Sequence, residues 1–306
     1  NALAAGLPGP VLAAALRAGN SPERVATLLA DLGLAGEDAS LRQDAVRVRT
    51  LGAFRVWRGA AELDRKAWGR KIALQLFHLL VVHRGDLLPK SRIVDLLWPD
   101  LEPGVADGTF RVALNALNKA LEPDRPSGRE PRHIIRQGTA YALRHGDDLS
   151  LDVAEFERLL DAAGVLEATG EDPGDVAERA LGLYDGDFLA EFIEYGDWCD
   201  RERERLAARF ADHAVRHARR LLGRGDAEGA ARSAGRLLDL DPCAEPAYRL
   251  LMAAQYRLGD RTAALRTYER CAETLERELG VEPMPETELL RAAIVERRPA
   301  GDLDIR

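Results

Sequence analysis

Hydrophobic residues change their spacing along this chain, and the changes divide it into segments of different secondary structure. From residue 46 to residue 58, apolar side chains alternate with arginines. The apolar positions are Val46, Val48, Leu51, Phe54 and Val56, and the arginines are Arg47, Arg49, Arg55 and Arg58. Alternation with a period of two predicts β-strands. We therefore expect a small sheet with one buried and one solvated face.

Beyond this sheet, apolar residues recur every three or four positions and predict three helices. The first covers about residues 70–83, the second 90–97 and the third about 105–121. Pro99 ends the second helix, because proline has no amide hydrogen and a fixed φ. The inward positions of the third helix are Phe110, Ala113, Leu114, Leu117 and Leu121. A short helix, a turn and a longer amphipathic helix predict a helix-turn-helix.

A β-hairpin is predicted after the third helix. Ile134 and Ile135 on one arm, and Tyr141 and Leu143 on the other, flank a turn at residues 137–139. Three helices followed by a hairpin make a winged helix. In this arrangement the second helix braces the third, which enters the major groove of DNA.

The sequence from residue 148 onward is predicted to be helical, and it contains an internal repeat. Gly225-Asp226 recurs as Gly259-Asp260 and Ala230 recurs as Ala264, each at an offset of 34 residues. This offset is the period of tetratricopeptide repeats. Further helices are expected at about residues 153–163, 175–184 and 198–222, with a capping helix at about 285–297.

These patterns predict a mainly α fold, with a winged helix-turn-helix and small β-sheets followed by an α-helical tetratricopeptide-like repeat domain. The expected boundaries are residues 46–147 for the winged helix and 148–306 for the repeat domain. Residues 1–45 are expected to form two short helices, at about 11–17 and 21–32, as an N-terminal extension or the end of an upstream domain. A partner-binding segment is the alternative. Because the chain begins with Asn1 rather than Met, we suspect a fragment.

Charge is distributed unevenly along the sequence. The whole chain carries a formal net charge of −8. Residues 46–147, by contrast, contain 18 Lys and Arg against 11 Asp and Glu. A basic segment within an acidic chain indicates that this segment meets an anionic partner, provided that its charges converge on one surface.

Several other classes of protein are disfavoured by the sequence. No apolar run approaches the roughly 18 residues of a membrane span, and no signal peptide begins the chain, so we expect a cytoplasmic protein without a membrane partner. Cys199, Cys243 and Cys271 lack metal or disulfide spacing. His213 and His217 stand four apart without an identifiable third ligand. No phosphate loop, dinucleotide fingerprint or nucleophile elbow is present, so we expect no enzyme, cofactor or metal.

The third helix carries the side chains that are best suited to reading DNA. Its outward face is expected to hold Arg111, Asn115, Asn118 and Lys119. Arginine can read guanine bidentately and asparagine can read adenine in the same way. Phosphate contacts are expected from residues in the first turns of the other helices and from the wing: Arg70, Lys71, Lys90, Arg92 and Arg136. The alternative for each is an ordinary solvated charge.

Two separate motif sets carry a family resemblance over about residues 46–298. The winged helix contains Leu97-Trp98-Pro99-Asp100, and the helical half ends in Glu278-Leu279-Gly280-Val281-Glu282-Pro283 followed by Pro285-Glu286. The chain thereby resembles the SARP class of bacterial transcription activators (the antibiotic-regulatory proteins), and its second half resembles the bacterial transcriptional activator domain.

This resemblance implies a response-regulator-type winged helix whose third helix and wing bind promoter repeats in double-stranded DNA. It also implies that the repeat domain shapes the assembly, with RNA polymerase or another protein as its partner. Carried over by position, the recognition helix holds Thr109, Arg111, Asn115, Asn118 and Lys119, and the wing holds Gln137, Gly138, Thr139, Ala140 and Tyr141.

Two functional hypotheses therefore remain. The first is a sequence-specific DNA-binding transcriptional regulator. The second is a tetratricopeptide-type scaffold that binds a protein segment and uses the winged helix for docking. Retention of a partner after deletion of the winged helix would favour the scaffold. The sequence leaves open the operator, the regulated genes, any effector and the oligomeric state.

Overall fold

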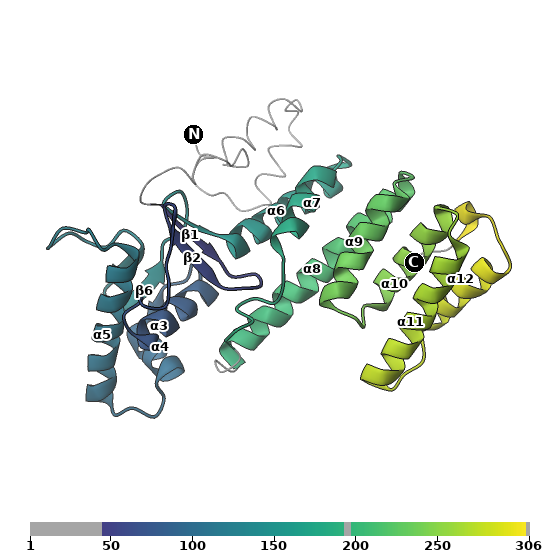
Figure 1. Ribbon diagram of the computed structural model, residues 1–306. Coiled ribbons are helices and arrows are strands. Elements are labelled where there is room, and N and C mark those ends of the chain that lie inside the picture. The colour runs from purple at the N-terminus through teal and green to yellow at the C-terminus, as the bar shows by residue number, and fades with distance from the viewer. Residues whose placement is uncertain (1–44, 193–196, 304–306) are drawn as a thin grey trace. The chain divides into compact units, whose positions relative to one another are not determined.

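The computed structural model describes residues 45–192 and 197–303, and these form two compact units. The first comprises the described residues up to Asp172 together with Leu183–Glu204, and the second comprises Pro173–Gly182 and the described residues from Arg205 onward. Figure 1 shows the elements of each unit. The helices expected in residues 1–44 lie outside the described part of the chain.

The first unit contains a four-stranded sheet in the order β3-β2-β1-β7. Its strands are β1 (Val46–Arg49), β2 (Arg55–Arg58), β3 (Ala61–Glu62) and β7 (Leu149–Leu151). The strands β1 and β2 are antiparallel, whereas β1 and β7 are parallel. Val46, Val48 and Val56 are buried, which confirms the alternation predicted from the sequence. The strand β7 was not predicted.

The winged helix follows this sheet. Its helices are α3 (Lys71–Val82), α4 (Lys90–Leu97) and α5 (Pro103–Leu121), close to the predicted ranges. A second sheet, in the order β4-β6-β5, consists of β4 (Leu88–Pro89), β5 (Ile134–Gln137) and β6 (Ala140–Leu143). The predicted hairpin is confirmed, since Gln137 pairs with Ala140 across a two-residue turn. The two-residue strand β4 was missed.

Residues after β7 complete the first unit. The helix α6 (Asp152–Thr169) begins immediately after β7, and Asp152 caps the end of β1 through hydrogen bonds from the backbone N–H groups of Thr50 and Leu51, at 2.8 and 2.9 Å. The segment 183–192 returns to the sheet, where Phe188 forms a β-bridge with Leu51. The sheet is therefore held by residues far along the chain.

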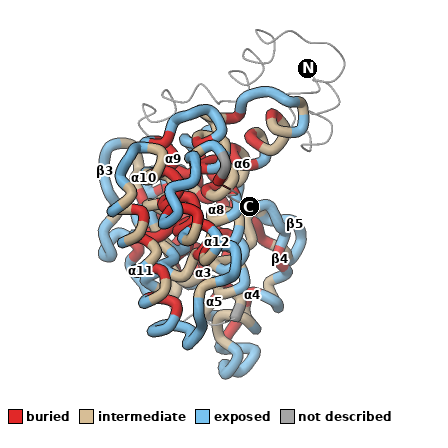
Figure 2. Tube along the Cα trace, turned by 90° about the vertical axis from the view of Figure 1, so that its right-hand side faces the viewer, coloured by how far each residue is buried: buried red, intermediate tan, exposed pale blue. Residues whose placement is uncertain are grey.

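The second unit consists of helices. Its elements are α7 (Gly174–Leu183), the later part of α8 (Asp197–Gly223), α9 (Ala227–Leu240), α10 (Glu245–Arg257), α11 (Arg261–Leu279), α12 (Pro285–Val295) and the short 3-10 helix η5 (Ala300–Asp302). Figure 2 shows buried positions gathered around α9 and α10. The mainly α fold with small sheets is confirmed.

The 34-residue repeat corresponds to two equivalent helix starts. Asp226 and Asp260 are the N-cap residues of α9 and α11, and each accepts a hydrogen bond from the backbone N–H three residues later, at 2.8 Å. Gly225 and Gly259 precede them, both at φ 85°, which non-glycine residues rarely adopt. The recurring alanines, Ala230 and Ala264, are fully buried. The repeat therefore preserves a turn, a cap and a close helix contact.

Candidate nucleic-acid interface

The exposed face of α5 carries most of the predicted base-reading residues. Arg111, Asn115 and Lys119 are all exposed. They are held there by a buried apolar row on the opposite face, formed by Ala106, Phe110, Ala113, Leu117, Ala120 and Leu121. Because the row packs against the rest of the unit, the three polar side chains share one solvent-facing surface. An amide, a guanidinium and an ammonium group on one helix face suit base edges and phosphates.

Asn118 does not belong to this surface, and its predicted outward position was wrong. It is only 6% exposed, and its Oδ1 has no hydrogen-bond partner among the described residues. The physical reason is the width of the apolar stripe. Asn118 stands one turn beyond the half-buried Leu114 and beside the buried Leu117, so it lies inside the flank of the stripe. Its polar character alone suggested exposure.

Thr109 is half-buried and already has a partner. Its Oγ1 donates a hydrogen bond to the Val105 carbonyl one turn earlier, at 2.9 Å. This is the usual way in which a helix satisfies an interior threonine. The hydroxyl group of Thr109 is thus already hydrogen-bonded within α5.

The starts of α3 and α4 hold the predicted phosphate contacts. Arg70, Lys71 and Arg92 are exposed. Lys90 instead forms an ion pair with Asp107 of α5, with Nζ 2.7 Å from Oδ1. The hydrogen bond from Lys90 lowers the pKa of Asp107. Lys90 consequently braces α4 against α5, and a phosphate would have to compete with this carboxylate.

The wing presents its turn to solvent and buries its base. Gln137, Gly138 and Thr139 are exposed, and Gly138 has φ 58°. Arg136 is exposed at the end of β5, where its Nε donates to the Gly138 carbonyl at 3.0 Å. Tyr141 had been placed with these residues by family position.

Tyr141 is instead part of the core. It is 7% exposed, and its ring lies 4.9 Å from that of Phe110, centroid to centroid. The expectation that Tyr141 is available for contact with DNA is therefore wrong. Alternation along β6 explains this, because the side chain of Tyr141 faces α5. Its contact fixes the wing against the recognition helix.

The comparisons with known proteins agree with this architecture. Residues 151–295 match the Bacterial transcriptional activator domain. The chain is 28% identical over 266 residues to the regulatory protein AfsR of Streptomyces griseus, which covers 85% of this chain and 26% of that protein. It is 26% identical over 234 residues to the regulatory protein DnrI of Streptomyces peucetius, covering 74% of this chain and 85% of the relative. The chain is therefore similar to SARP-type regulators, and the similarity to AfsR extends over 85% of its length.

A solved structure supports the fold of this chain. EmbR of Mycobacterium tuberculosis, solved in complex with a low affinity phosphopeptide, superposes with a TM-score of 0.66 at 20% identity. The match covers 85% of this chain and 66% of the EmbR chain. The named relatives are regulatory proteins. This chain spans about a quarter of AfsR.

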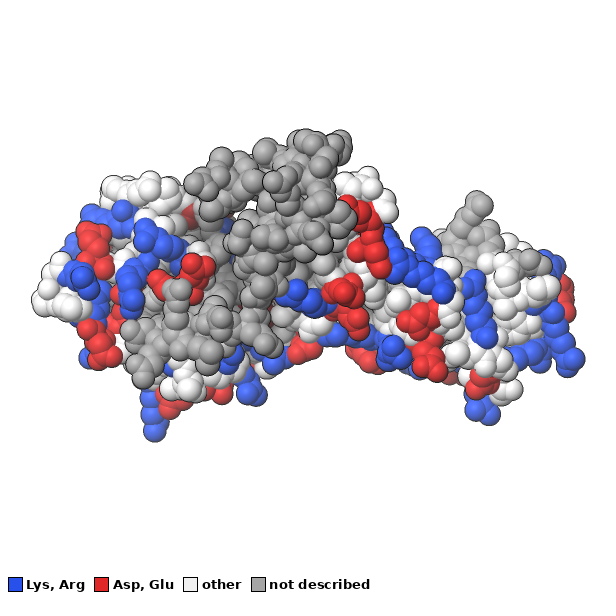
Figure 3. Space-filling model, turned by 90° about the horizontal axis from the view of Figure 1, so that it is seen from above, with Lys and Arg blue, Asp and Glu red and all other residues white. Residues whose placement is uncertain are grey.

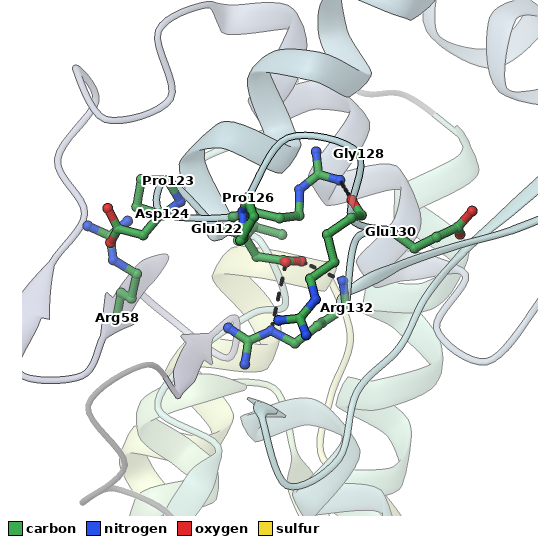
Figure 4. A pocket seen from close by; sticks show the side chains of 11 residues that line it. Arg58, Glu122, Pro123, Asp124, Pro126, Gly128, Glu130 and Arg132 are labelled. Carbon is green, nitrogen blue, oxygen red and sulfur yellow. Dashed lines mark hydrogen bonds and ion pairs between the residues drawn. The ribbon is translucent and has the colours of Figure 1, made fainter.

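Several cations that lie near Lys119, beside the C-terminal half of α5, were not predicted from the sequence. A groove of about 360 Å³ is lined by Arg58, Lys66 and Lys119 together with Ala116. A larger cavity of about 760 Å³ adjoins it and shares Arg58 (Figure 4). The loop after α5 contributes Arg125, Arg129 and Arg132 to this cavity. The signal available in the sequence was the density of arginine in residues 123–132.

The larger cavity is not purely cationic. Glu122 is buried, and its Oε1 accepts hydrogen bonds from the backbone N–H groups of Arg132 and His133, at 2.8 and 3.1 Å. Asp124 and Glu130 also line it. More widely, basic and acidic side chains are interspersed on the face displayed in Figure 3. The cavity beside α5 therefore presents basic and acidic side chains together rather than a field of one sign.

No metal or membrane site competes with this interpretation in the part of the chain that the structure describes. Residues 45–192 and 197–303 contain no group of three or more His, Cys, Asp or Glu that could hold a metal ion. His213 and His217 are buried within α8. None of the described helices combines the length and apolarity needed to cross a membrane.

Proposed function

We propose that this SARP-type chain is a sequence-specific DNA-binding transcriptional activator that binds promoter repeats through α5. The observation that carries the proposal is the exposed row of Arg111, Asn115 and Lys119, opposite a fully buried face of the same helix. Relatives named as regulatory proteins support the same role. In a winged helix, such a face enters the major groove.

Individual roles follow from side-chain chemistry. Arg111 is proposed to read guanine and Asn115 to read adenine, because each can form two hydrogen bonds to the corresponding base edge. Lys119 stands near the end of the same row and suits a base edge or phosphate. Backbone phosphates are proposed to contact the exposed Arg70, Lys71 and Arg92, with Arg136, Gln137 and Thr139 approaching from the wing.

The helical repeats are proposed to act in assembly or regulation. Residues 148–306 would form this domain and residues 46–147 the winged helix. A protein partner such as RNA polymerase would contact the repeats, because stacked helical repeats offer extended binding surfaces. A pull-down with the winged helix deleted tests this part separately from DNA binding.

The decisive experiment is selection of bound sequences from a random DNA pool at near-physiological salt, followed by titration against scrambled DNA. We expect a repeated element bound at least about a thousandfold more tightly than scrambled DNA. Failure to enrich any sequence would refute DNA reading by this chain alone.

Variants separate base readers from phosphate contacts. Arg111→Ala should relax preference at one base position, whereas Lys71→Ala should weaken all sequences alike. Lys71→Ala should also reduce the log–log salt slope by about 0.9 for one lost phosphate contact. Arg277→Ala is a matched control, since Arg277 is an exposed cation of α11 that pairs with Glu278. An unchanged slope would remove Lys71 from the interface.

A further inference from the structure

Two valines lie exposed on the recognition helix. Val105 is 58% exposed and Val112 is 39% exposed, and both belong to α5. Valine at a solvated helix position gains little from packing. It also has a lower helix propensity than alanine or leucine. Neither the fold nor the proposed hydrogen-bonding residues use these side chains.

The valines belong to the same row as the polar readers. Val105, Val112, Asn115 and Lys119 follow the three-, four- and seven-residue spacing of one helix face. Gly108 stands between the two valines, and a Cβ placed there would meet nothing within 4 Å. The outward face of α5 therefore carries both apolar and polar side chains, with Arg111 between the two valines in sequence and Asn115 and Lys119 after them.

The chemistry of this mixed row identifies one occupant. Arg111 and Lys119 beside it favour an anionic partner, and the valines favour apolar groups within that same partner. The major groove of DNA provides both, because the C5-methyl group of thymine is an apolar group on a base edge between phosphates. A purely apolar protein surface would leave the two cations without partners.

We propose that Val105 and Val112 read the 5-methyl groups of thymines, so that each bound repeat contains thymine at positions facing these valines. The proposal rests on the proposed function, since it requires α5 to lie in the major groove. It adds an apolar component of specificity to the hydrogen bonds of Arg111 and Asn115. Loss of either valine then changes which base is preferred at its own position.

The test uses the full chain and the DNA element recovered by selection. Each thymine is replaced singly by deoxyuridine, which removes the methyl group and keeps every hydrogen-bonding atom. Burial of one methyl group corresponds to about fourfold in affinity. We expect about fourfold weaker binding at the thymines that face the valines, and no change at other thymines.

Variants of the two valines test which thymine methyl group each valine contacts. In Val112→Ala, replacement of one particular thymine should no longer weaken binding, while the effect at the thymine facing Val105 persists. Val105→Ala should show the reverse. Leu289→Ala, at a 70% exposed position of α12, is the control and should keep both effects. Because both valines are exposed and alanine has the higher helix propensity, the two variants should unfold at the wild-type temperature or slightly above it.

The possible outcomes separate this inference from the proposed function. Equal binding of thymine and deoxyuridine elements, or discrimination that survives in the Val105→Ala, Val112→Ala double variant, overturns the inference and leaves DNA reading intact. Failure of the chain to select any sequence overturns both. Loss of a protein partner without any change in DNA preference would assign the valines to a protein contact and would also overturn the inference.

Discussion

Two regions of the first unit differ in how they place their charged side chains. One is the exposed face of α5, and the other is the region where β7, α6 and the start of α8 meet the winged helix. On α5 the exposed Arg111, Asn115 and Lys119 reach solvent. In the second region, called here the rear junction, charged side chains are enclosed and paired over long sequence separations. Arg84 is its centre, with a side chain that is only 8% exposed. The comparison indicates that the proposed DNA contacts and the stability of the first unit depend on different residues.

The rear junction connects the winged helix to sequence that matches the activator domain. The guanidinium of Arg84 pairs with Glu157 of α6 and with Glu202 of α8, the latter at 2.7 Å. Arg203 donates to the carbonyls of Phe188 and Leu189, at 2.8 and 3.0 Å. Residues from α6, the segment 183–192 and the start of α8 therefore complete the core of the first unit, which also holds α5. An interpretation of the winged helix as residues 46–147 alone omits these contacts.

The largest expected effect is at Arg84. Arg84→Met removes the cation between two partly buried carboxylates and should lower the free energy of unfolding by about 3–5 kcal/mol. Urea denaturation measures this change. Arg291→Met is the matched control, because Arg291 pairs with Glu288 at the surface, where loss of an ion pair costs at most about 1 kcal/mol. Similar losses in both variants would contradict the comparison.

At the recognition face the expected pattern is the reverse. Arg111→Ala and Asn115→Ala should each weaken binding to the selected DNA by about 1–3 kcal/mol, because a bidentate base contact is lost. Their free energies of unfolding should stay within about 0.5 kcal/mol of the wild type, as expected for surface positions. Titration and urea denaturation of the same preparations provide both values. If a variant lost both stability and affinity, the replaced side chain would contribute to the stability of the fold, and the comparison would fail for that residue.

The stability of the first unit should also depend on pH, through a histidine in its buried core. Burial lowers the pKa of His78 on α3 to about 3, and its ring packs against those of Phe54 and Phe192, at centroid distances of 4.4 and 4.1 Å. Below about pH 6.5 the unfolded chain binds a proton that folded His78 does not. Stability should therefore fall with decreasing pH, by up to about 1.4 kcal/mol per unit from this group.

Urea titrations between pH 6.5 and 5 test this prediction. His78→Leu removes the titrating ring, so the slope of unfolding free energy against pH should become shallower, whatever the variant's absolute stability. His83, His133 and His145 also have pKa values lowered mainly by burial, so a residual slope is expected. An identical slope in His78→Leu would show that His78 does not contribute.

The contrast between local patterns and contacts over long sequence separations explains which features could be predicted from the sequence. Helices α3, α4 and α5 and the hairpin follow from periodicity, which is local. The strands β4 and β7 have two and three residues, too few for a periodic pattern, and their pairing depends on distant partners. The alternating charges near the start of α8 are typical of a solvated helix, yet Glu202 and Arg203 are largely buried, because alternation of charges does not reveal a buried partner such as Arg84.

The smallest expected effect concerns Asn118, which lies between the two classes of residue. Asn118→Ala removes a buried amide whose Oδ1 has no partner among the described residues, and alanine has the higher helix propensity. These gains oppose the loss of packing, so stability should change by no more than about 1 kcal/mol. DNA affinity should remain unchanged, whereas Asn115→Ala, three residues earlier on the exposed face, should weaken it. If Asn118→Ala reduced affinity and not stability, the side chain would have to leave the core on binding, and the separation between reading and packing would fail at this position.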